Sequence, residues 1–172
     1  MADQLAATRP RTVLLSFYPD VAAGIATGRI PWEFRRRRSG HETGTRVLMY
    51  SSAPVAAFTG AYTCGAVFAY DSLEELRAGV HAAERARYAP DAPTPGWLER
   101  LDEWLERIHA GLPQGHAFEA CSPRLYTPPI PLGPREDGRA AKPPQGFQYL
   151  DLERVEHRRL WEAVGEGERA GA

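Results

Sequence analysis

The sequence predicts a single α+β domain in which a small, strongly bent β-sheet comes before an added helical segment. Short apolar runs rich in β-branched and aromatic residues fill most of the first 70 residues, with breaks at Pro54, Gly60 and Gly65. Such breaks suit bends or bulges in a curved sheet. Residues 72–111 change to the three-to-four-residue apolar spacing of helices. With 172 residues, 43% hydrophobic and 25% charged, the chain is in the range of one domain with its own core.

Strands dominate the first part of the chain. The apolar runs predict strands at residues 12–17, 32–37, 46–51 and 55–70. Between the first two strands, apolar residues at helical spacing predict a short helix over residues 19–27, with a proline in its first turn and a glycine after its end.

Helices alternate with short strands in the second part. A Ser-x-x-Glu capping box opens a helix over 72–88, and a Thr-Pro start opens another over 94–111, where regularly spaced tryptophans and leucines predict a core face. Two further strands are predicted at 118–126 and 146–150, followed by a helix that Asp151 caps and that ends at Val164.

The domain is predicted to span residues 11–164. We expect a flexible N-terminus at 1–10 and a polar, glycine-rich, disordered tail at 165–172. Within the domain, residues 72–111 form the helical elaboration, and residues 127–145, rich in proline and glycine, form a loop.

Several function classes are excluded by composition. The apolar runs are far shorter than the roughly 20 residues of a membrane helix, and the N-terminus lacks the features of a secretory signal, so we expect a cytoplasmic protein with no membrane partner. Cys64 and Cys121 are far apart and indicate free thiols. The five histidines lack metal-ligand spacing, so we predict no metal and no cofactor. The sequence leaves the oligomeric state open.

The densest charge cluster is the arginine run at 35–38. The net charge is only -1, so attraction to a polyanion has to come from local clustering. Guanidinium groups bind phosphate bidentately and do not titrate, which favours a phosphate site, although a solvated strand end is the alternative. Alternation along the strand places Arg35 and Arg37 on one face, and leaves Arg36 and Arg38 at the rim or in solvent.

Glu33 shares the predicted face of Arg35 and Arg37. Its neighbours Trp32 and Phe34 are apolar, and an unpaired buried carboxylate is costly, so we expect Arg35 to be its partner. Glu33 either orients Arg35 or contacts a ligand. In the second case it accepts hydrogen bonds from the edge of a base or acts as an acid–base group. Trp32 is expected to anchor the strand from the core.

Four further residues complete the candidate set. Arg29 and Arg46 flank the arginine run, and Tyr18 and Tyr50 lie at strand ends where an aromatic ring can stack on a base. Core packing is the alternative for each tyrosine, and Tyr18 is the more exposed of the two by position. The predicted ligand-binding residues are therefore Arg29, Glu33, Arg35, Arg37, Arg46, Tyr18 and Tyr50.

Three stretches together resemble the ASCH domain family. Residues 14–37 (LLSFYPDVAAGIATGRIPWEFRRR) contain an apolar strand, a short helix, a glycine and a strand ending in E-x-R-R. Residues 46–67 (RVLMYSSAPVAAFTGAYTCGAV) resemble the family's strand with a small residue, a proline and a glycine, and PPIPL followed by PPQGFQYL is similar to its closing elements. The resemblance covers about half of the chain and implies a PUA-like fold, a small bent β-barrel with peripheral helices.

The resemblance also implies a function in nucleic-acid binding. Its fold group binds RNA, and sometimes DNA or modified nucleosides, in a cleft between the barrel and the helix after the first strand. Members include RNA-binding modules, ribonuclease-like proteins and amidohydrolases of an acetylated cytidine nucleoside, and fold alone does not select among them. We expect a binding module for RNA or another nucleic acid or nucleotide. The alternatives are a hydrolase of a modified nucleoside amide or an RNA phosphodiester, using Glu33 and Arg35, and a regulatory protein-interaction domain that uses the helical segment.

The amidohydrolase motif of the family, Gly-x-Lys-x-x-Thr-x-Arg, is only partly present. Aligned on Gly28, the chain has Ile30 at the lysine position, Glu33 at the threonine position and Arg35 at the arginine position. Because Ile30 cannot hold a charge or move a proton, the lysine chemistry is absent from this motif. Lys142, the sole lysine of the chain, can take the place of the motif's lysine only if the proline-rich loop folds back over the cleft. This favours binding over catalysis.

Overall fold

The chain forms two compact units in a computed structural model that describes residues 11–37, 41–87 and 100–170. The first unit comprises Met1–Pro31, Gly40–Cys64 and Ala120–Ala172, and the second comprises Trp32–Ser39 and Gly65–Glu119. The sequence predicts one domain. Two long strands, described next, each have residues in both units. The predicted N-terminal segment 1–10 lies outside the described residues.

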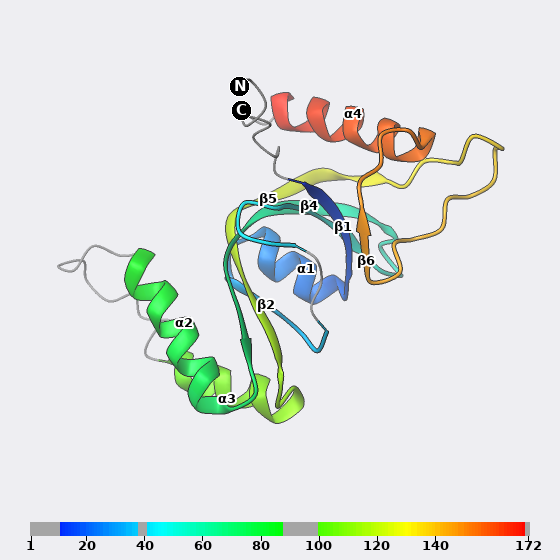
Figure 1. The fold of residues 1–172 in the computed structure, drawn as a ribbon. Helices are drawn as coiled ribbons and strands as arrows, with labels where there is room; N and C mark the ends of the chain where they lie inside the picture. The colour runs from blue at the N-terminus through cyan, green and yellow to red at the C-terminus, as the bar shows by residue number, and fades with distance from the viewer. Residues whose placement is uncertain (1–10, 38–40, 88–99, 171–172) are drawn as a thin grey trace, which may run out of the picture. The chain divides into compact units, whose positions relative to one another are not determined.

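Strands and helices follow the predicted α+β order (Figure 1). The described elements are β1 (Thr12–Phe17), α1 (Pro19–Ala26), β2 (Trp32–Arg35), β3 (Arg46–Ser51), β4 (Ala57–Tyr70), α2 (Leu73–Arg87), α3 (Leu101–Gly111), β5 (Gly115–Pro131), β6 (Phe147–Tyr149) and α4 (Val155–Ala170). Hydrogen bonds join the strands in the order β2-β5-β4-β3-β1-β6, with β1 and β3 parallel. The strands β4 and β5 are the two that continue from one unit into the other.

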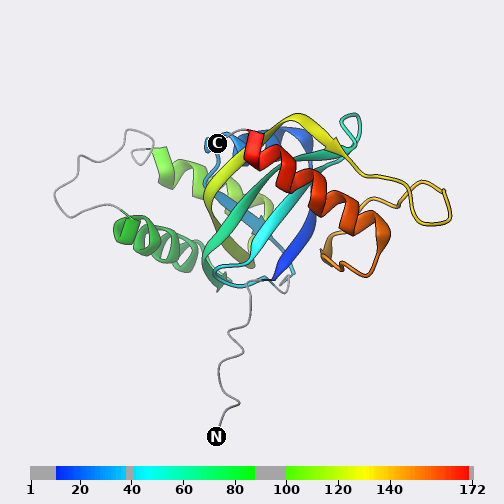
Figure 2. The ribbon, with the colours of Figure 1, turned by 90° about the horizontal axis from the view of Figure 1, so that it is seen from above.

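The sheet of the first unit is covered on both faces. Because side chains alternate along a strand, β3 presents Val47 and Met49 to one face and Leu48 and Tyr50 to the other. A Cβ placed on Gly60 of β4 would lie near Met49 and the α1 residue Ala26, so α1 covers that face. The second face packs Leu48 and Tyr50 in one cluster with residues of α4, and Figure 2 shows α4 lying across these strands.

α1 forms where the proline at its start and the glycine after its end predict a helix. Pro19 occupies the first turn, and Gly28 after the helix has a φ of +73°, which favours glycine. The predicted irregularity at Gly60 is also confirmed. The register changes from Met49 opposite Gly60 to Tyr50 opposite Phe58, which leaves one extra residue on β4 as a bulge.

The second unit packs two helices on a short piece of sheet. Buried Leu76 and Val80 of α2 and Leu101 and Leu105 of α3 form one cluster with Trp32. The apolar faces of α2 and α3 that carry these residues therefore pack within the unit. Of the predicted helix 94–111, residues 94–99 lie outside the described residues.

The capping box of α2 is present. Ser72 Oγ accepts a hydrogen bond from the backbone N–H of Glu75 at 3.2 Å, and Glu75 Oε2 accepts one from the backbone N–H of Asp71 at 2.9 Å. These bonds satisfy backbone donors at the start of the helix, which begins at Leu73.

Two elements are longer than predicted. β5 extends from Gly115 to Pro131, so residues 127–131 of the predicted loop belong to a strand. Because β2 pairs only with residues 116–119, residues 120–131 have no described strand on that side, and prolines are tolerated at such an edge. α4 begins at Val155, later than the predicted cap at Asp151, and continues to Ala170. The prediction of a disordered tail from 165 is thus wrong up to Ala170, because Glu168 makes tertiary contacts that composition does not reveal.

Candidate functional site

Glu33 and Arg35 form an ion pair on β2. The Glu33 side chain is 4% exposed and that of Arg35 is 22% exposed, and the Arg35 Nε donates to Glu33 Oε1. The expectation that Arg35 partners Glu33 is confirmed. Trp32 is 1% exposed, as expected for the residue that anchors the strand. Because Glu33 partly neutralises Arg35, this guanidinium offers less free charge to a phosphate than the sequence suggests.

A second group of buried carboxylates lies in the same unit. Glu84 on α2 and Glu119 on β5 are 2% and 8% exposed. Arg87, at the end of α2, donates to Glu119 Oε1 through Nε at 3.1 Å and through Nη2, and its Nη1 lies 3.6 Å from Glu84 Oε2. Trp32 Nε1 donates to Glu84 Oε1 at 2.9 Å, and the Ala66 N–H donates to Glu119 Oε2 at 2.8 Å. The Arg87 guanidinium thus lies beside both carboxylates, and each of them accepts a hydrogen bond from a neutral donor.

Sequence reasoning missed these three charged residues. Glu84 lies four residues after Val80 and eight after Leu76, so it stands on the apolar stripe of α2, and a charge on such a stripe indicates a buried partner. Glu119 stands in an apolar strand next to Phe118. Nothing in either pattern indicates that both carboxylates share one arginine.

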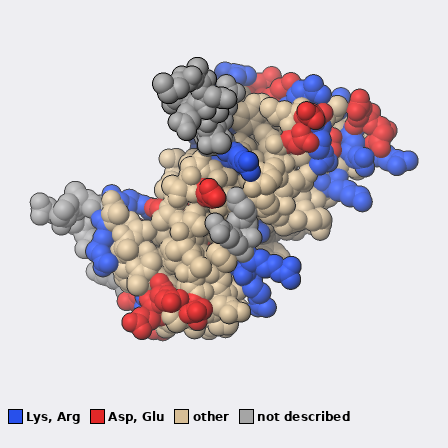
Figure 3. Space-filling model, in the orientation of Figure 1, with Lys and Arg blue, Asp and Glu red and all other residues tan. Residues whose placement is uncertain are grey.

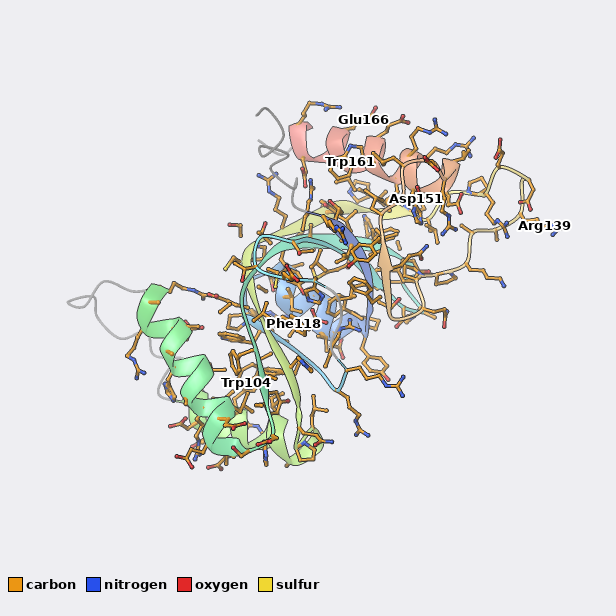
Figure 4. The ribbon with its side chains drawn as sticks, viewed as in Figure 1. Trp104, Phe118, Arg139, Asp151, Trp161 and Glu166 are labelled. Carbon is orange, nitrogen blue, oxygen red and sulfur yellow. The ribbon has the colours of Figure 1, made fainter. Side chains whose placement is uncertain are left out.

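Arg46 on β3 is engaged by α4. It forms an ion pair with Glu168, and its guanidinium carbon lies 5.3 Å from the centre of the Trp161 ring. Figure 4 shows Trp161 on the sheet side of α4, whereas Glu166 lies on the opposite side. Glu168 also accepts a hydrogen bond from the Tyr126 hydroxyl at 3.3 Å. Burial raises the pKa of Tyr126 to about 12, although the neighbouring Arg46 lowers it. Arg46 therefore connects α4 to the sheet.

The two tyrosine candidates differ in exposure. Tyr50 is 5% exposed and packs edge-on against Phe58, with ring centres 5.3 Å apart, on the sheet face covered by α4. Tyr18, just before α1, is 80% exposed. Nearby in the chain, Arg29 is exposed and its Nε donates to Thr27 Oγ1 at 3.2 Å. Tyr18 and Arg29 are thus the candidates of the first unit that are open to a ligand.

The candidate set divides between the two units. The first unit holds Tyr18, Arg29, Arg46 and Tyr50, and the second holds Glu33, Arg35 and Arg37. The structure brings Glu33 and Arg35 into direct contact. Arg46 and Tyr50 contact residues of their own unit, and the other candidates are exposed.

Exposed arginines follow the Glu33–Arg35 pair. Arg36 and Arg37 are both exposed, and neither makes an ion pair within the residues that the structure describes. Arg36, which the sequence places at the rim or in solvent, lines a hollow of about 660 Å³ together with His116. Arg38 lies outside the described residues.

Ile30 packs where the family motif has its lysine. Its backbone N–H donates to the carbonyl of Gly24 at 2.9 Å, and a Cβ on Gly24 would overlap the Ile30 side chain. Ile30 therefore lies against α1 as an apolar packing residue. Lys142 is exposed in the segment between β5 and β6.

The described residues hold no group of three or more His, Cys, Asp or Glu side chains that could bind a metal ion. Cys64 is buried, Cys121 is partly buried, and neither is in a disulfide bond. Among the described helices, none has the length and apolar character needed to cross a membrane.

The sequence matches no family model and no curated protein sequence. Its structure is similar to that of an ASCH protein from Zymomonas mobilis, with a TM-score of 0.59, 22% identity, and coverage of 89% of this chain and 95% of that one. A serine-to-alanine variant of the Zymomonas mobilis protein gives a TM-score of 0.58 at 21% identity and covers 91% of this chain and 97% of that one. The chain therefore has the ASCH fold, and the resemblance expected from the sequence motifs is confirmed at the level of fold.

Proposed function

We propose that this protein binds nucleic acid, with RNA or a nucleotide as the ligand, through the exposed arginines at the end of β2. The ASCH fold supports this function class. The observation that carries the proposal is the exposure of Arg36 and Arg37 without ion pairs among the described residues. A guanidinium that has no protein carboxylate to neutralise it is available to bind phosphate bidentately.

Several other arginines of the protein lie beside acids. Arg77 on α2, for example, lies 3.4 Å from Asp102 and pairs with Glu106. In Figure 3, blue and red side chains are mixed over α4 and the segment before β6, whereas blue side chains alone stand where β2 ends. With a net charge of -1, this local excess is what would attract a polyanion.

The first unit, taken by itself, holds two further exposed residues that can contact a nucleic acid. Arg29 is an exposed cation, and Tyr18 offers an exposed ring for stacking on a base. Arg46 and Tyr50 are left out because α4 and the core occupy them. Glu33 is assigned the positioning of Arg35 through their ion pair.

Fluorescence anisotropy with labelled single-stranded RNA, single-stranded DNA and duplexes, over a series of salt concentrations, tests the proposal. We expect the double variant Arg36→Ala/Arg37→Ala to lower the slope of log K against log salt by about 0.7 for each single-strand phosphate that it no longer neutralises. The matched control is Arg85→Ala/Arg107→Ala, which removes two exposed arginines from α2 and α3. Absence of binding at low salt, or equal losses of affinity in the two double variants, would overturn the proposal.

A hydrolase is the second candidate, because buried ionisable groups cluster at catalytic sites. In that case Glu33 would act as the general base and acid, taking a proton from the attacking nucleophile and giving it to the leaving group. Arg35 would stabilise the negative charge that develops on the substrate. Turnover of an acetylated cytidine nucleoside or of RNA should then disappear in Glu33→Gln and persist in Glu103→Gln, an exposed α3 residue. Far-UV circular dichroism checks that both variants fold. No turnover in the unmodified protein removes this candidate.

A further inference from the structure

The hollow beside Arg36 lies wholly within the second unit, where β2 and β4 end and α2 and β5 begin. It has a volume of about 660 Å³, within the range of roughly 300–1,000 Å³ that small-molecule ligands occupy. Figure 3 shows uncharged surface between acidic side chains at the start of α2 and basic side chains at the end of β2. The hollow thus has opposite charges at its two sides.

Small residues form part of the lining of this hollow and allow close packing around it. Ala78 and Gly79 of α2 and Gly115 of β5 are part of its lining. A Cβ on Gly79 would overlap the ring of Phe68, and a Cβ on Gly115 would come within 2.6 Å of the Arg35 carbonyl oxygen. The Phe68 ring therefore packs directly on the backbone of α2 and supplies an aromatic wall.

Polar groups around the hollow have unused hydrogen-bonding capacity. Arg36 and the Asp71 carboxylate make no ion pair within the described residues, and the Nδ1 atom of His116 is buried without a hydrogen-bond partner there. Glu75 uses Oε2 to accept from the Asp71 backbone. A ligand that fits must offer an anion to Arg36 and hydrogen-bond donors to the carboxylate side.

We propose that this hollow binds one nucleotide whose base carries an exocyclic amino group, with its phosphate on Arg36 and its amino group on Asp71. Carboxylates accept hydrogen bonds from base amino groups such as that of cytosine, whereas uracil would present carbonyl oxygens that repel them. Phe68 provides a wall for the base. This inference rests on the proposed function and specifies its ligand, which is either a free nucleotide or one nucleotide of a strand.

Isothermal titration calorimetry of the full chain with cytidine, adenosine and uridine monophosphates and with inorganic phosphate tests the inference. We expect the cytidine and adenosine nucleotides to bind about tenfold more tightly than the uridine nucleotide, because one charge-assisted hydrogen bond is lost. Arg36→Ala should weaken all three about tenfold or more. Asp71→Asn should remove the preference among bases, because its amide group can also donate to uracil.

A variant that fills the hollow without changing charge provides the sharpest control. Ala78 and Ala82 are both exposed on α2, but only Ala78 lines the hollow. Ala78→Leu should abolish mononucleotide binding, whereas Ala82→Leu should leave it unchanged. Equal binding by these two variants, or phosphate alone binding as tightly as a nucleotide, would overturn the inference.

The RNA anisotropy assay on the same variants separates this inference from the proposed function. RNA binding that needs Arg36 and Arg37, with no mononucleotide binding at millimolar concentration, would overturn the inference and leave the proposed function standing. Absence of both activities would overturn both. Mononucleotides that compete with RNA in the unmodified protein, but not in Ala78→Leu, would support the strand as a source of the nucleotide.

Discussion

Replacing Arg87 with alanine removes the guanidinium that Glu84 and Glu119 share. Both carboxylates are buried, and each would keep one neutral donor, Trp32 Nε1 for Glu84 and the Ala66 N–H for Glu119. Removing one partner of a buried ion pair costs about 3–5 kcal/mol. Because the Arg87 side chain is itself 31% exposed, we expect a loss near the lower end, about 3 kcal/mol of unfolding free energy.

Urea unfolding, followed by tryptophan fluorescence and far-UV circular dichroism at pH 7, measures this loss. Arg85→Ala is the matched control, because Arg85 is also basic and in the last turn of α2 but makes no ion pair among the described residues. Both variants lose the same favourable interaction with the helix dipole. The control should change stability by less than about 0.5 kcal/mol, as is usual for surface substitutions.

A second substitution separates charge from packing. Arg87→Met keeps most of the side-chain volume but not the charge, so it should lose nearly as much stability as Arg87→Ala. A loss below about 1 kcal/mol at pH 7, or one equal to that of Arg85→Ala, would refute the shared-guanidinium argument. A variant Arg87→Met that is as stable as the unmodified protein would refute its electrostatic origin.

Three further outcomes are expected. Burial lowers the pKa of His157 below its usual 6.5. As the pH drops through 6.5, the unfolded chain is therefore protonated at His157 before the folded chain, and the stability of the fold should decrease. In thermal unfolding, His157→Gln should reduce this dependence of stability on pH. Gly60→Ala should cost more than about 2 kcal/mol in urea unfolding, because the new Cβ would overlap the backbone carbonyl of Arg124. Arg46→Ala should cost about 1–2 kcal/mol and lower the melting temperature, because it loses Glu168 and a cation–π contact.

Each outcome has a control in the same chain. His109→Gln, on α3, should leave the pH slope unchanged. Gly111→Ala places a Cβ where no atom lies within 4 Å and should be tolerated. Arg158→Ala removes an exposed arginine of α4 and should be nearly neutral. A pH slope that persists in His157→Gln, or equal effects within either of the other pairs, would contradict the stated cause.

Local patterns were sufficient to predict much of the fold. The bounds of β1 and β3 match the prediction, because apolar runs closed by breaking residues indicate strands directly. Pro19 and Gly28 marked the start and end of α1 through their own backbone preferences. The pairing of Glu33 with Arg35 was predictable because residues two apart on a strand share a face.

The sequence by itself thus determined the order of the helices and strands, and which residues of one strand share a face. It did not determine what covers that face. Only the tertiary structure decided that Arg46 and Tyr50 face α4, that Glu84 and Glu119 share Arg87, and that α4 continues past Gly165. The physical reason is that periodicity reports the direction of a side chain relative to its own backbone. The partners of a side chain depend on contacts between segments that are distant in the sequence. These contacts also decide whether an arginine such as Arg36 is neutralised by an acid.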